Sequence, residues 1–385
     1  MSKKQMECIY AKKCGGCQLQ NMTYDRQLRF KQAKVVKGLG RFHRVNDIIG
    51  MENPYHYRNK VQSAFALTRR GKIVSGVYQS STKTVVNVDS CMIEDEMADR
   101  IIVAIRKMLP DFKILPYSEY TKKGFLRHIL VKRSFSTNQI MVVFIGAGPI
   151  FPQKDKITKV LIKKFPEITT VVFNINQNKA SMLLGDKQQV LYGKGYIEDV
   201  LCGLKFRISA RSFYQVNPVQ TEVLYNTAMD FANISENDVV IDAYCGTGTI
   251  GLVASKKARE VIGVEVNADA VKDAKINAKI NGIDNAEFYN EDATEFMEKM
   301  ALNNEKADVV FIDPPRAGST KSFLKSLVKL SPKKIVYVSC NPETQRRDLF
   351  ELTDNGYEVK IIQPIDMFPH TNHVETVVLL EVKHQ

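Results

Sequence analysis

The sequence predicts an α/β protein made of two halves, an N-terminal α+β half and a C-terminal doubly wound parallel sheet. From residue 218 onward, apolar runs of strand length alternate with stretches of helix length, the order found in parallel sheets with helices on both faces. Between residues 55 and 200, short apolar runs are separated by Gly and Asn, and few helical periods occur. Because 385 residues exceed one ordinary domain, we place one domain at 1–205 and a second at 206–385.

Strand-like runs dominate the N-terminal half. They are short, rich in β-branched residues and bounded by polar residues or glycine, which favours an antiparallel sheet. The expected strands cover 83–88, 127–135, 139–148 and 169–178.

The C-terminal half begins with an amphipathic helix expected over 218–232, with Pro218 in its first turn. Gly282 and Gly356 lie where two later helices should end. The expected strands are 238–244, 260–266, 307–313, 333–339, 357–366 and 375–382, and the expected helices between them are 248–258, 268–282, 321–330 and 343–356.

Positive charge is concentrated at the front of the chain. Residues 1–60 hold 13 Lys and Arg against 4 Asp and Glu, whereas the residues after 135 are slightly acidic, although the whole chain carries a net charge of +13. This distribution predicts a polyanion-binding part joined to a part with another task; the alternative is a merely solvated lysine-rich surface. The candidate phosphate contacts are Arg58, Lys60, Arg69, Arg70, Arg127, Lys132 and Arg133.

The composition is that of a globular protein, with 44% hydrophobic and 25% charged residues. No apolar run approaches the roughly 20 residues of a membrane-spanning helix. The first ten residues, MSKKQMECIY, lack the apolar centre of a secretory signal. We therefore expect a cytoplasmic protein that makes no contact with membranes.

Three of the seven cysteines gather at the N-terminus. Cys8 is followed by the pair Cys14 and Cys17, and Cys91 lies further along the chain. A CxxC pair with a third nearby thiol and a distant fourth is typical of a thiolate-bound metal centre. The spacing alone leaves zinc and an iron–sulfur cluster equally open, with a redox CxxC beside unrelated thiols as the third alternative.

The first strand of the C-terminal half runs into a glycine-rich turn. Gly246, Gly248 and Gly251 form a GxGxxG pattern that opens a helix, and Glu265 ends the next strand. Such a turn lets a ligand approach the helix N-terminus, and an acid at the second strand end can accept hydrogen bonds from ribose hydroxyls. These residues predict a nucleoside-containing cofactor, for which NAD and S-adenosylmethionine are both candidates.

Later strand ends favour methyl transfer over hydride transfer. The strand that ends near Asp313 continues as Asp-Pro-Pro-Arg, a stiff loop at the sheet edge where ligands of such folds bind. A rigid loop there lets a planar ring lie beside a methyl donor. A hydride-transfer enzyme would not require it.

Two further strand ends supply a candidate nucleophile and a candidate base. Cys340 ends a strand before a helix whose N-terminus should stabilise a thiolate. Glu375 begins the last strand and can act as a general base beside it. His370, His373 and Glu375 could alternatively form a metal triad. Cys202 and Cys245 are interpreted as structural thiols.

Taken together, CxxxxxCGGC, SFYQVN, DAYCGTGTIG, DPPR, SCNP and HVET resemble the RNA uracil-C5 methyltransferase family that carries an iron–sulfur cluster. The resemblance covers nearly the whole chain. It implies a Rossmann-like class I methyltransferase domain, with Cys340 as nucleophile and Glu375 as base. It further implies a [4Fe–4S] cluster on Cys8, Cys14, Cys17 and Cys91, contacts to S-adenosylmethionine from Gln215, Tyr244, Glu265 and Asp313, and weaker candidates in Asp242 and Asn217.

The resemblance also bears on partners and organisation. Many members carry a small β-barrel RNA-binding domain before the first cluster cysteine, and we expect this chain to lack it because only seven residues precede Cys8. Residues of about 20–51 are expected to pack on the catalytic domain.

The cluster favours 23S ribosomal RNA over transfer RNA as substrate, since bacterial tRNA-directed relatives commonly lack it. We expect a monomer. The alternatives from other classes are an NAD-dependent oxidoreductase with an iron–sulfur module and a non-enzymatic RNA-binding redox sensor.

Overall fold

The computed structural model describes residues 8–80, 82, 84–177 and 183–383. The outer positions of two expected strands, 83 and 178, fall outside these ranges. Within them, no helix is both long and apolar enough to cross a membrane.

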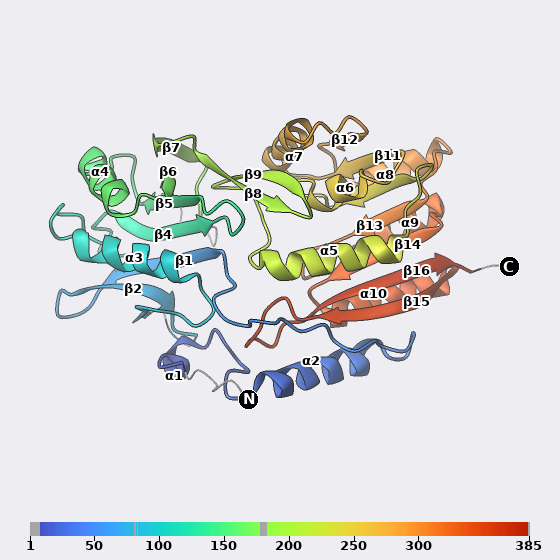
Figure 1. Cartoon of the computed structure of the whole chain (residues 1–385), viewed down its shortest axis with the longest axis horizontal. Coiled ribbons are helices and arrows are strands. Elements are labelled where there is room, and N and C mark those ends of the chain that lie inside the picture. The colour runs from blue at the N-terminus through green and yellow to red at the C-terminus, as the bar shows by residue number, and fades with distance from the viewer. Residues whose placement is uncertain (1–7, 81, 83, 178–182, 384–385) are drawn as a thin grey trace.

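The C-terminal half is built on a seven-stranded sheet in the order β12-β11-β10-β13-β14-β16-β15 (Figure 1). The first five of these strands are parallel, as the sequence predicts, whereas β16 is antiparallel to both β14 and β15. This exception arises because a short loop joins β15 directly to β16, and neighbours joined in this way can pair only antiparallel. The strands are β10 (Val239–Ala243), β11 (Glu260–Val264), β12 (Ala286–Tyr289), β13 (Val309–Ile312), β14 (Lys334–Ser339), β15 (Tyr357–Ile365) and β16 (Glu375–Val382).

Helices cover both faces of this sheet. Adjacent residues of β10 show the alternation, because Val240 packs into one hydrophobic core with α5, α6 and α7, and Ile241 into the other with α8, α9 and α10. Both residues are fully buried, which explains why the strand reads as a continuous apolar run. The helices are α5 (Pro218–Ala232), α6 (Thr249–Ala254), α7 (Ala268–Ile280), α8 (Ala293–Leu302), α9 (Lys321–Leu330) and α10 (Pro342–Asp354).

The N-terminal half holds a second seven-stranded sheet, in the order β3-β2-β1-β4-β5-β6-β7. The expectation of an antiparallel sheet is wrong for one pair, because β5 and β6 are parallel. Helix α4 crosses over between these two strands, which is the connection that a parallel pair requires. The elements are β1 (Lys60–Leu67), β2 (Ile73–Tyr78), β3 (Val85–Asn87), α3 (Glu96–Met108), β4 (Leu126–Arg133), β5 (Ile140–Gly146), α4 (Lys154–Lys164), β6 (Ile168–Ile175) and β7 (Lys187–Tyr192).

A two-stranded hairpin of β8 (Tyr196–Leu201) and β9 (Leu204–Ser209) lies between the two halves (Figure 1). Strand β8 contacts β5 and β6 on one side, and β9 contacts α7 on the other. Buried side chains from both sheets join the hairpin in one hydrophobic core. The two halves are therefore packed together rather than tethered by a free linker.

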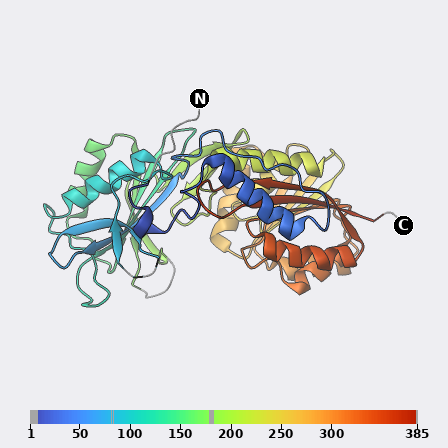
Figure 2. The ribbon, with the colours of Figure 1, turned by 90° about the horizontal axis from the view of Figure 1, so that it is seen from below.

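The N-terminal segment reaches across to the C-terminal half. After the short helix α1 (Ala11–Cys14), helix α2 (Tyr24–Leu39) contacts α10 and β15 and lies along that part of the molecule (Figure 2). Bridges from Val45 to Ile362 and from Ile49 to Ile365 extend the contact beyond the helix. Residues that precede the first sheet in sequence thus pack against the second sheet.

Candidate functional site

The glycine-rich turn connects β10 to α6 and is held by two acids. Asp242 accepts a hydrogen bond from Gly251 N at 2.7 Å, and its burial raises its pKa to about 7. Glu265, at the end of β11, accepts one from Gly246 N at 3.1 Å. Tyr244 enters the turn in the left-handed backbone region with a φ of 67°, a conformation that non-glycine residues adopt mostly at constrained, often functional, positions.

A cavity of about 630 Å³ opens beside this turn, between the two halves of the molecule. Gly246 and Glu265 line it from the C-terminal sheet, Lys60 and Gln62 from β1, and Phe213 from the loop before α5. The structure thus places two parts of the predicted cofactor site on one cavity. The residues that line this cavity do not include Gln215, Tyr244 or Asp313. Asn217 is buried and donates a hydrogen bond to Met367 O at 3.0 Å.

The candidate nucleophile, Cys340, and the candidate base, Glu375, lie at the ends of neighbouring strands. The antiparallel register of β14 and β16 pairs Ser339 with Thr376, so the next positions, Cys340 and Glu375, lie together beyond that pair. Asp313 follows the neighbouring strand β13 at the same edge of the sheet. Topology therefore brings together three residues that are separated in the sequence.

Burial and charge set the acidity of this group. Burial raises the pKa of Glu375 to about 8; the charge of Asp313 raises it as well, and Arg316 lowers it. Burial alone raises the pKa of Asp313 to about 7. The pKa of Cys340 is raised to about 11 by burial and then by Glu375 and Asp313, against Arg316. In the free protein, burial and the two acids therefore oppose the thiolate that the helix N-terminus is expected to stabilise.

Arg316 is the functional candidate to which sequence analysis assigned no role. Asn341 Nδ2 and Thr344 Oγ1 both donate to its backbone oxygen at 3.2 Å, which ties the Asp-Pro-Pro-Arg loop to the turn after β14. Its guanidinium lies 3.5 Å from His373 Nε2 and lowers the pKa of both Cys340 and Glu375. The available signal was its position directly after the two prolines.

The metal-triad alternative at the histidines is wrong. No group of three or more His, Cys, Asp or Glu within the described ranges has the arrangement of a metal-ion site. Both ring nitrogens of His370 are engaged, since Nδ1 accepts from Gln27 Nε2 at 3.2 Å and Nε2 donates to Pro54 O at 3.0 Å.

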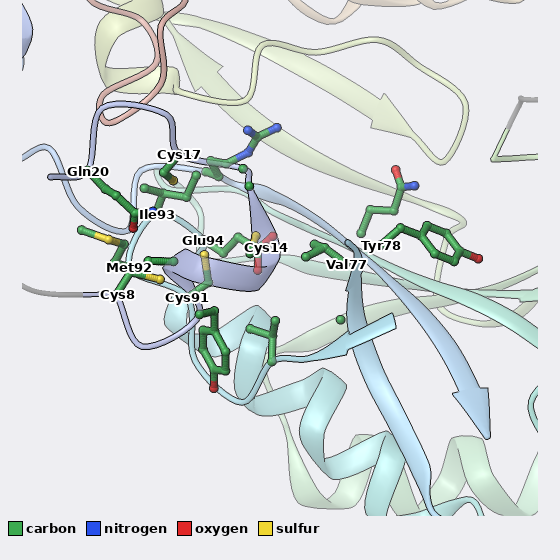
Figure 3. A pocket seen from close by; sticks show the side chains of 18 of the residues that line it. Cys8, Cys14, Cys17, Gln20, Val77, Tyr78, Cys91, Met92, Ile93 and Glu94 are labelled. Carbon is green, nitrogen blue, oxygen red and sulfur yellow. The ribbon is translucent and has the colours of Figure 1, made fainter. Parts of the chain in front are cut away.

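The four N-terminal candidate cysteines line one cavity of about 320 Å³. Figure 3 shows them gathered with Glu94 at one end of this pocket, with Tyr78 at the other. All four thiols are free. Burial and neighbouring thiols raise the pKa of Cys17 to about 12, because crowded thiolates would repel one another. Four free sulfurs that line one cavity have the donor chemistry of an iron–sulfur cluster, but no group of three or more His, Cys, Asp or Glu in the described part of the chain, these four included, is arranged to hold a metal ion.

Some basic side chains of the N-terminal part are exposed, and others are bonded to acids or backbone oxygens of the protein itself. Lys132 is buried and donates to Ser209 O and Ser212 O at 2.8 Å each, so its ammonium group already has two partners within the protein. Arg127 pairs with Glu119, and Arg133 pairs with Asp95. Arg69 and Arg70 are exposed in the turn between β1 and β2.

Comparisons with known proteins agree on one family. The family model described as tRNA (Uracil-5-)-methyltransferase matches residues 23–383. A protein of Oceanobacillus iheyensis described as an uncharacterized RNA methyltransferase is 45% identical over 376 residues, 96% of this chain and 82% of the relative. A similarly described protein of Clostridium acetobutylicum is 45% identical over 381 residues, 97% and 83% of the two chains.

A solved structure matches at the level of the whole molecule. The tRNA (uracil-54, C5)-methyltransferase of Pyrococcus abyssi, in complex with S-adenosyl-L-homocysteine, is 29% identical with a TM-score of 0.79. The match covers 95% of this chain and 85% of that one. It includes both sheets, so the likeness extends beyond the nucleoside-binding half.

Proposed function

Because this chain belongs to the tRNA (uracil-5-)-methyltransferase family and is an S-adenosylmethionine-dependent RNA uracil-C5 methyltransferase, we propose that it methylates a uridine of 23S ribosomal RNA through a covalent adduct on Cys340. The observation that carries the proposed chemistry is the meeting of Cys340 and Glu375 where β14 ends and β16 begins. Membership of this family excludes the hydride-transfer and non-enzymatic alternatives.

The chemistry requires both side chains because C5 of uracil is a poor nucleophile. The Cys340 thiolate adds to C6 and forms an enolate, and C5 then attacks the methyl group of the sulfonium, releasing S-adenosylhomocysteine. Glu375 removes the proton from C5, and the electron pair left behind expels the thiolate from C6. Each bond to Cys340 that forms is broken again, so the enzyme is regenerated.

We assign the cofactor to the glycine-rich turn and the strand ends around it. Glu265 already bonds to Gly246 N, so a ribose would meet a carboxylate that is held in place. Gln215 in the loop before α5 and Tyr244 at the end of β10 are both half-buried. The proposed contacts are Gln215, Tyr244, Glu265 and Asp313.

We also assign a [4Fe–4S] cluster to Cys8, Cys14, Cys17 and Cys91. The support is the chemistry of the donor set, since four free thiols line one cavity and thiolates are the usual ligands of such clusters. When bound, the cluster would supply a stable cross-link between the N-terminal segment and the first sheet. The proposed methyl transfer moves no electrons through it.

The RNA target has two candidates. The cysteine cavity favours 23S ribosomal RNA, whereas the Pyrococcus abyssi structure favours transfer RNA, because that enzyme acts on uracil-54 of tRNA. Mapping 5-methyluridine in both RNAs from a deletion strain and from a complemented strain separates them. We expect a site in 23S ribosomal RNA to lose its methyl group and regain it on complementation; loss in tRNA alone would establish the second candidate.

The assigned nucleophile and base are tested by two substitutions that should differ in kind. Cys340→Ala should give neither product nor covalent RNA, because no thiolate can add to C6. Glu375→Gln should add, transfer the methyl and then stall, because the C5 proton remains. On a denaturing gel, we expect a shifted band of methylated RNA only for Glu375→Gln.

S-adenosylhomocysteine affinity, measured by calorimetry, is the control for folding of both variants. A crosslink in Cys340→Ala would reassign the nucleophile. Absence of a crosslink in Glu375→Gln would move the base elsewhere, with His373 as the neighbouring candidate.

A further inference from the structure

Glu375 is positioned by a loop that belongs to a hairpin. Strands β15 and β16 are antiparallel, and their closing pair is Ile365 with Glu375. The loop 366–374 therefore connects Ile365 to the proposed base, Glu375. Its last residue is joined covalently to Glu375, so the conformation of the loop bears on the position of the Glu375 backbone.

Helix α2 holds the start of this loop through a buried ion pair. Lys31 Nζ lies 2.5 Å from Asp366 Oδ1, and both side chains are completely buried. Lys31 also donates to Phe368 O at 2.9 Å, and Tyr24 OH donates to Asp366 Oδ2 at 2.9 Å. Asp366 is the residue after Ile365, so these bonds act one position from the closing pair of the hairpin.

The middle of the loop is held by the same N-terminal segment. Gln27, one turn before Lys31, accepts from His370 N at 2.8 Å and donates to His370 Nδ1. Tyr57 OH donates to Pro369 O at 3.0 Å, and Leu19 N donates to His370 O at 2.9 Å. His370 has a φ of 69°, so external partners fix a backbone conformation that this residue rarely adopts on its own.

Stability alone gives a weak reason for a buried ion pair. Removing two charges from water costs several kcal/mol per ion in real proteins, and well-packed apolar residues often stabilise such a site equally or better. What the pair supplies is a fixed geometry, because each oxygen of Asp366 has its own donor on α2. Proton abstraction depends on such geometry, since displacement of a catalytic group by about 1 Å can cost two orders of magnitude in rate.

We propose that Lys31 and Asp366 are positioning residues for proton removal, clamping the loop 366–374 so that Glu375 reaches the C5 proton. The proposal rests on the assignment of Glu375 as the base. It assigns to the N-terminal segment a part in one chemical step, separate from RNA binding and from the cysteine cavity. Neither Lys31 nor Asp366 touches the reacting atoms.

The test replaces the pair by apolar residues, so that no lone charge is left buried. In Lys31→Met/Asp366→Leu, we expect S-adenosylhomocysteine affinity and the single-turnover rate of methyl transfer to stay close to wild type. Release of RNA from the adduct should slow by roughly tenfold to a hundredfold, so methylated RNA covalently bound to Cys340 should accumulate in the steady state. Lys31→Met alone should show the same accumulation in whatever fraction folds.

The matched control is Val35→Ala. Val35 lies one turn further along α2 and is fully buried in the core that α2 shares with α9 and α10. Its apolar side chain forms no hydrogen bond to the loop, so this variant loosens the helix without removing the ion pair. It should lower the melting temperature without trapping RNA. Normal RNA release in the double variant, or equal trapping in Val35→Ala, would overturn the proposal.

Glu375→Gln is run beside these variants to separate the two assignments. If Glu375→Gln traps methylated RNA and the double variant does not, the assignment of Glu375 as the base is supported and the proposed role of Lys31 and Asp366 is wrong. If Glu375→Gln does not trap RNA, both assignments are wrong.

Discussion

At the scale of single residues, the charge at the proposed reaction centre is set by one guanidinium, Arg316, and two carboxyls, Asp313 and Glu375. Arg316 lowers the pKa of Cys340 and of Glu375, while Asp313 raises both. Addition to C6 needs the thiolate form of Cys340, and removal of the C5 proton needs the carboxylate form of Glu375. Arg316 therefore favours both steps through charge alone, although it takes no proton itself.

Replacing Arg316 by Gln should shift adduct formation to higher pH. Without the guanidinium the Cys340 thiol loses a proton less readily, and removal of an opposite charge at this range raises the pKa of a thiol by roughly one or more. The measurement is the rate of adduct formation with 5-fluorouracil RNA across pH, at saturating RNA. Arg346→Gln, an exposed arginine of α10, is the control. An unchanged profile would mean that Arg316 serves RNA binding instead.

Glu375 should also make stability depend on pH. Its pKa rises from 4.5 to about 8 on folding, so the folded state retains a proton that the unfolded state has lost. The stabilisation is complete below pH 4.5 and disappears as pH rises through 8. Urea unfolding of wild type and Glu375→Gln at pH 5 and pH 8 should show wild type losing stability relative to the variant, by at most about 1.4 kcal/mol for each step of one in pH. A pH-independent difference would contradict the buried, protonated carboxyl.

The sequence offers Cys340 and Glu375 as candidates for this centre but does not indicate their acidity. Cys340 and Glu375 could be predicted because strand ends and turn residues leave a local pattern. The raised pKa of Cys340 could not, because it depends on burial and on Asp313, which follows another strand. Arg316 was visible in the same motif, yet only the fold shows that it faces the thiol and the base.

At the scale of elements, the turn between β1 and β2 is the part of the basic front best placed to meet RNA. Arg69 and Arg70 are exposed there, whereas Lys132 is buried under the loop before α5. Arg69→Ala/Arg70→Ala should weaken RNA binding and flatten its salt dependence, because each phosphate that an arginine neutralises releases counterions. The slope of log affinity against log salt should fall by roughly 0.7 for each phosphate that is no longer neutralised. Cofactor affinity should not change.

The control for that double variant is Lys163→Ala/Lys164→Ala, which removes two exposed lysines of α4 outside the basic front. Its salt slope should match wild type. Equal slopes for both double variants would place the phosphates elsewhere. Lys132→Met is expected to lower the melting temperature instead, because it leaves Ser209 O and Ser212 O without their donor.

Continuous apolar strands could be predicted, but an apolar period alone was not sufficient, because helix α3 and strands β8 and β9 have one and were missed. The central strands of the C-terminal half, β10, β13 and β14, are almost fully buried, and their positions agree with expectation to within a few residues. Helix α2 was not predicted as a helix, because its buried stripe consists of Gln27, Lys31, Val35 and Leu39. Half of that stripe is polar, and those two residues hold the loop before Glu375. The edge strand β12 was missed because Phe288 is its one buried residue.

At the scale of the whole molecule, the N-terminal segment contacts three regions that are distant from one another in the sequence. Its cysteines line the cavity beside the first sheet, residues 18 and 19 reach the loop before Glu375, and α2 packs on the second sheet. Sequence order could not reveal this path, since the contacts with the loop and with the second sheet join residues more than 300 positions apart. The family resemblance, rather than a local pattern, raised the expectation that residues 20–51 pack on the catalytic half.

This arrangement yields a test of whether the cysteine cavity serves structure or chemistry. Cys14→Ser removes one proposed cluster ligand at the end of α1, but leaves Tyr24, Gln27 and Lys31 in place on α2. We therefore expect lower iron content, lower solubility and weaker RNA binding, because the segment loses its cross-link to the first sheet. Single-turnover methyl transfer by the soluble fraction, at saturating RNA, should stay near the wild-type rate, because the clamp on the hairpin and the pair Cys340 and Glu375 are untouched.

Cys202→Ser, a half-buried thiol on the β8–β9 hairpin, is the matched control and should change none of these properties. A soluble Cys14→Ser protein that binds RNA normally yet fails to transfer the methyl group would show that the cavity acts in the chemistry itself.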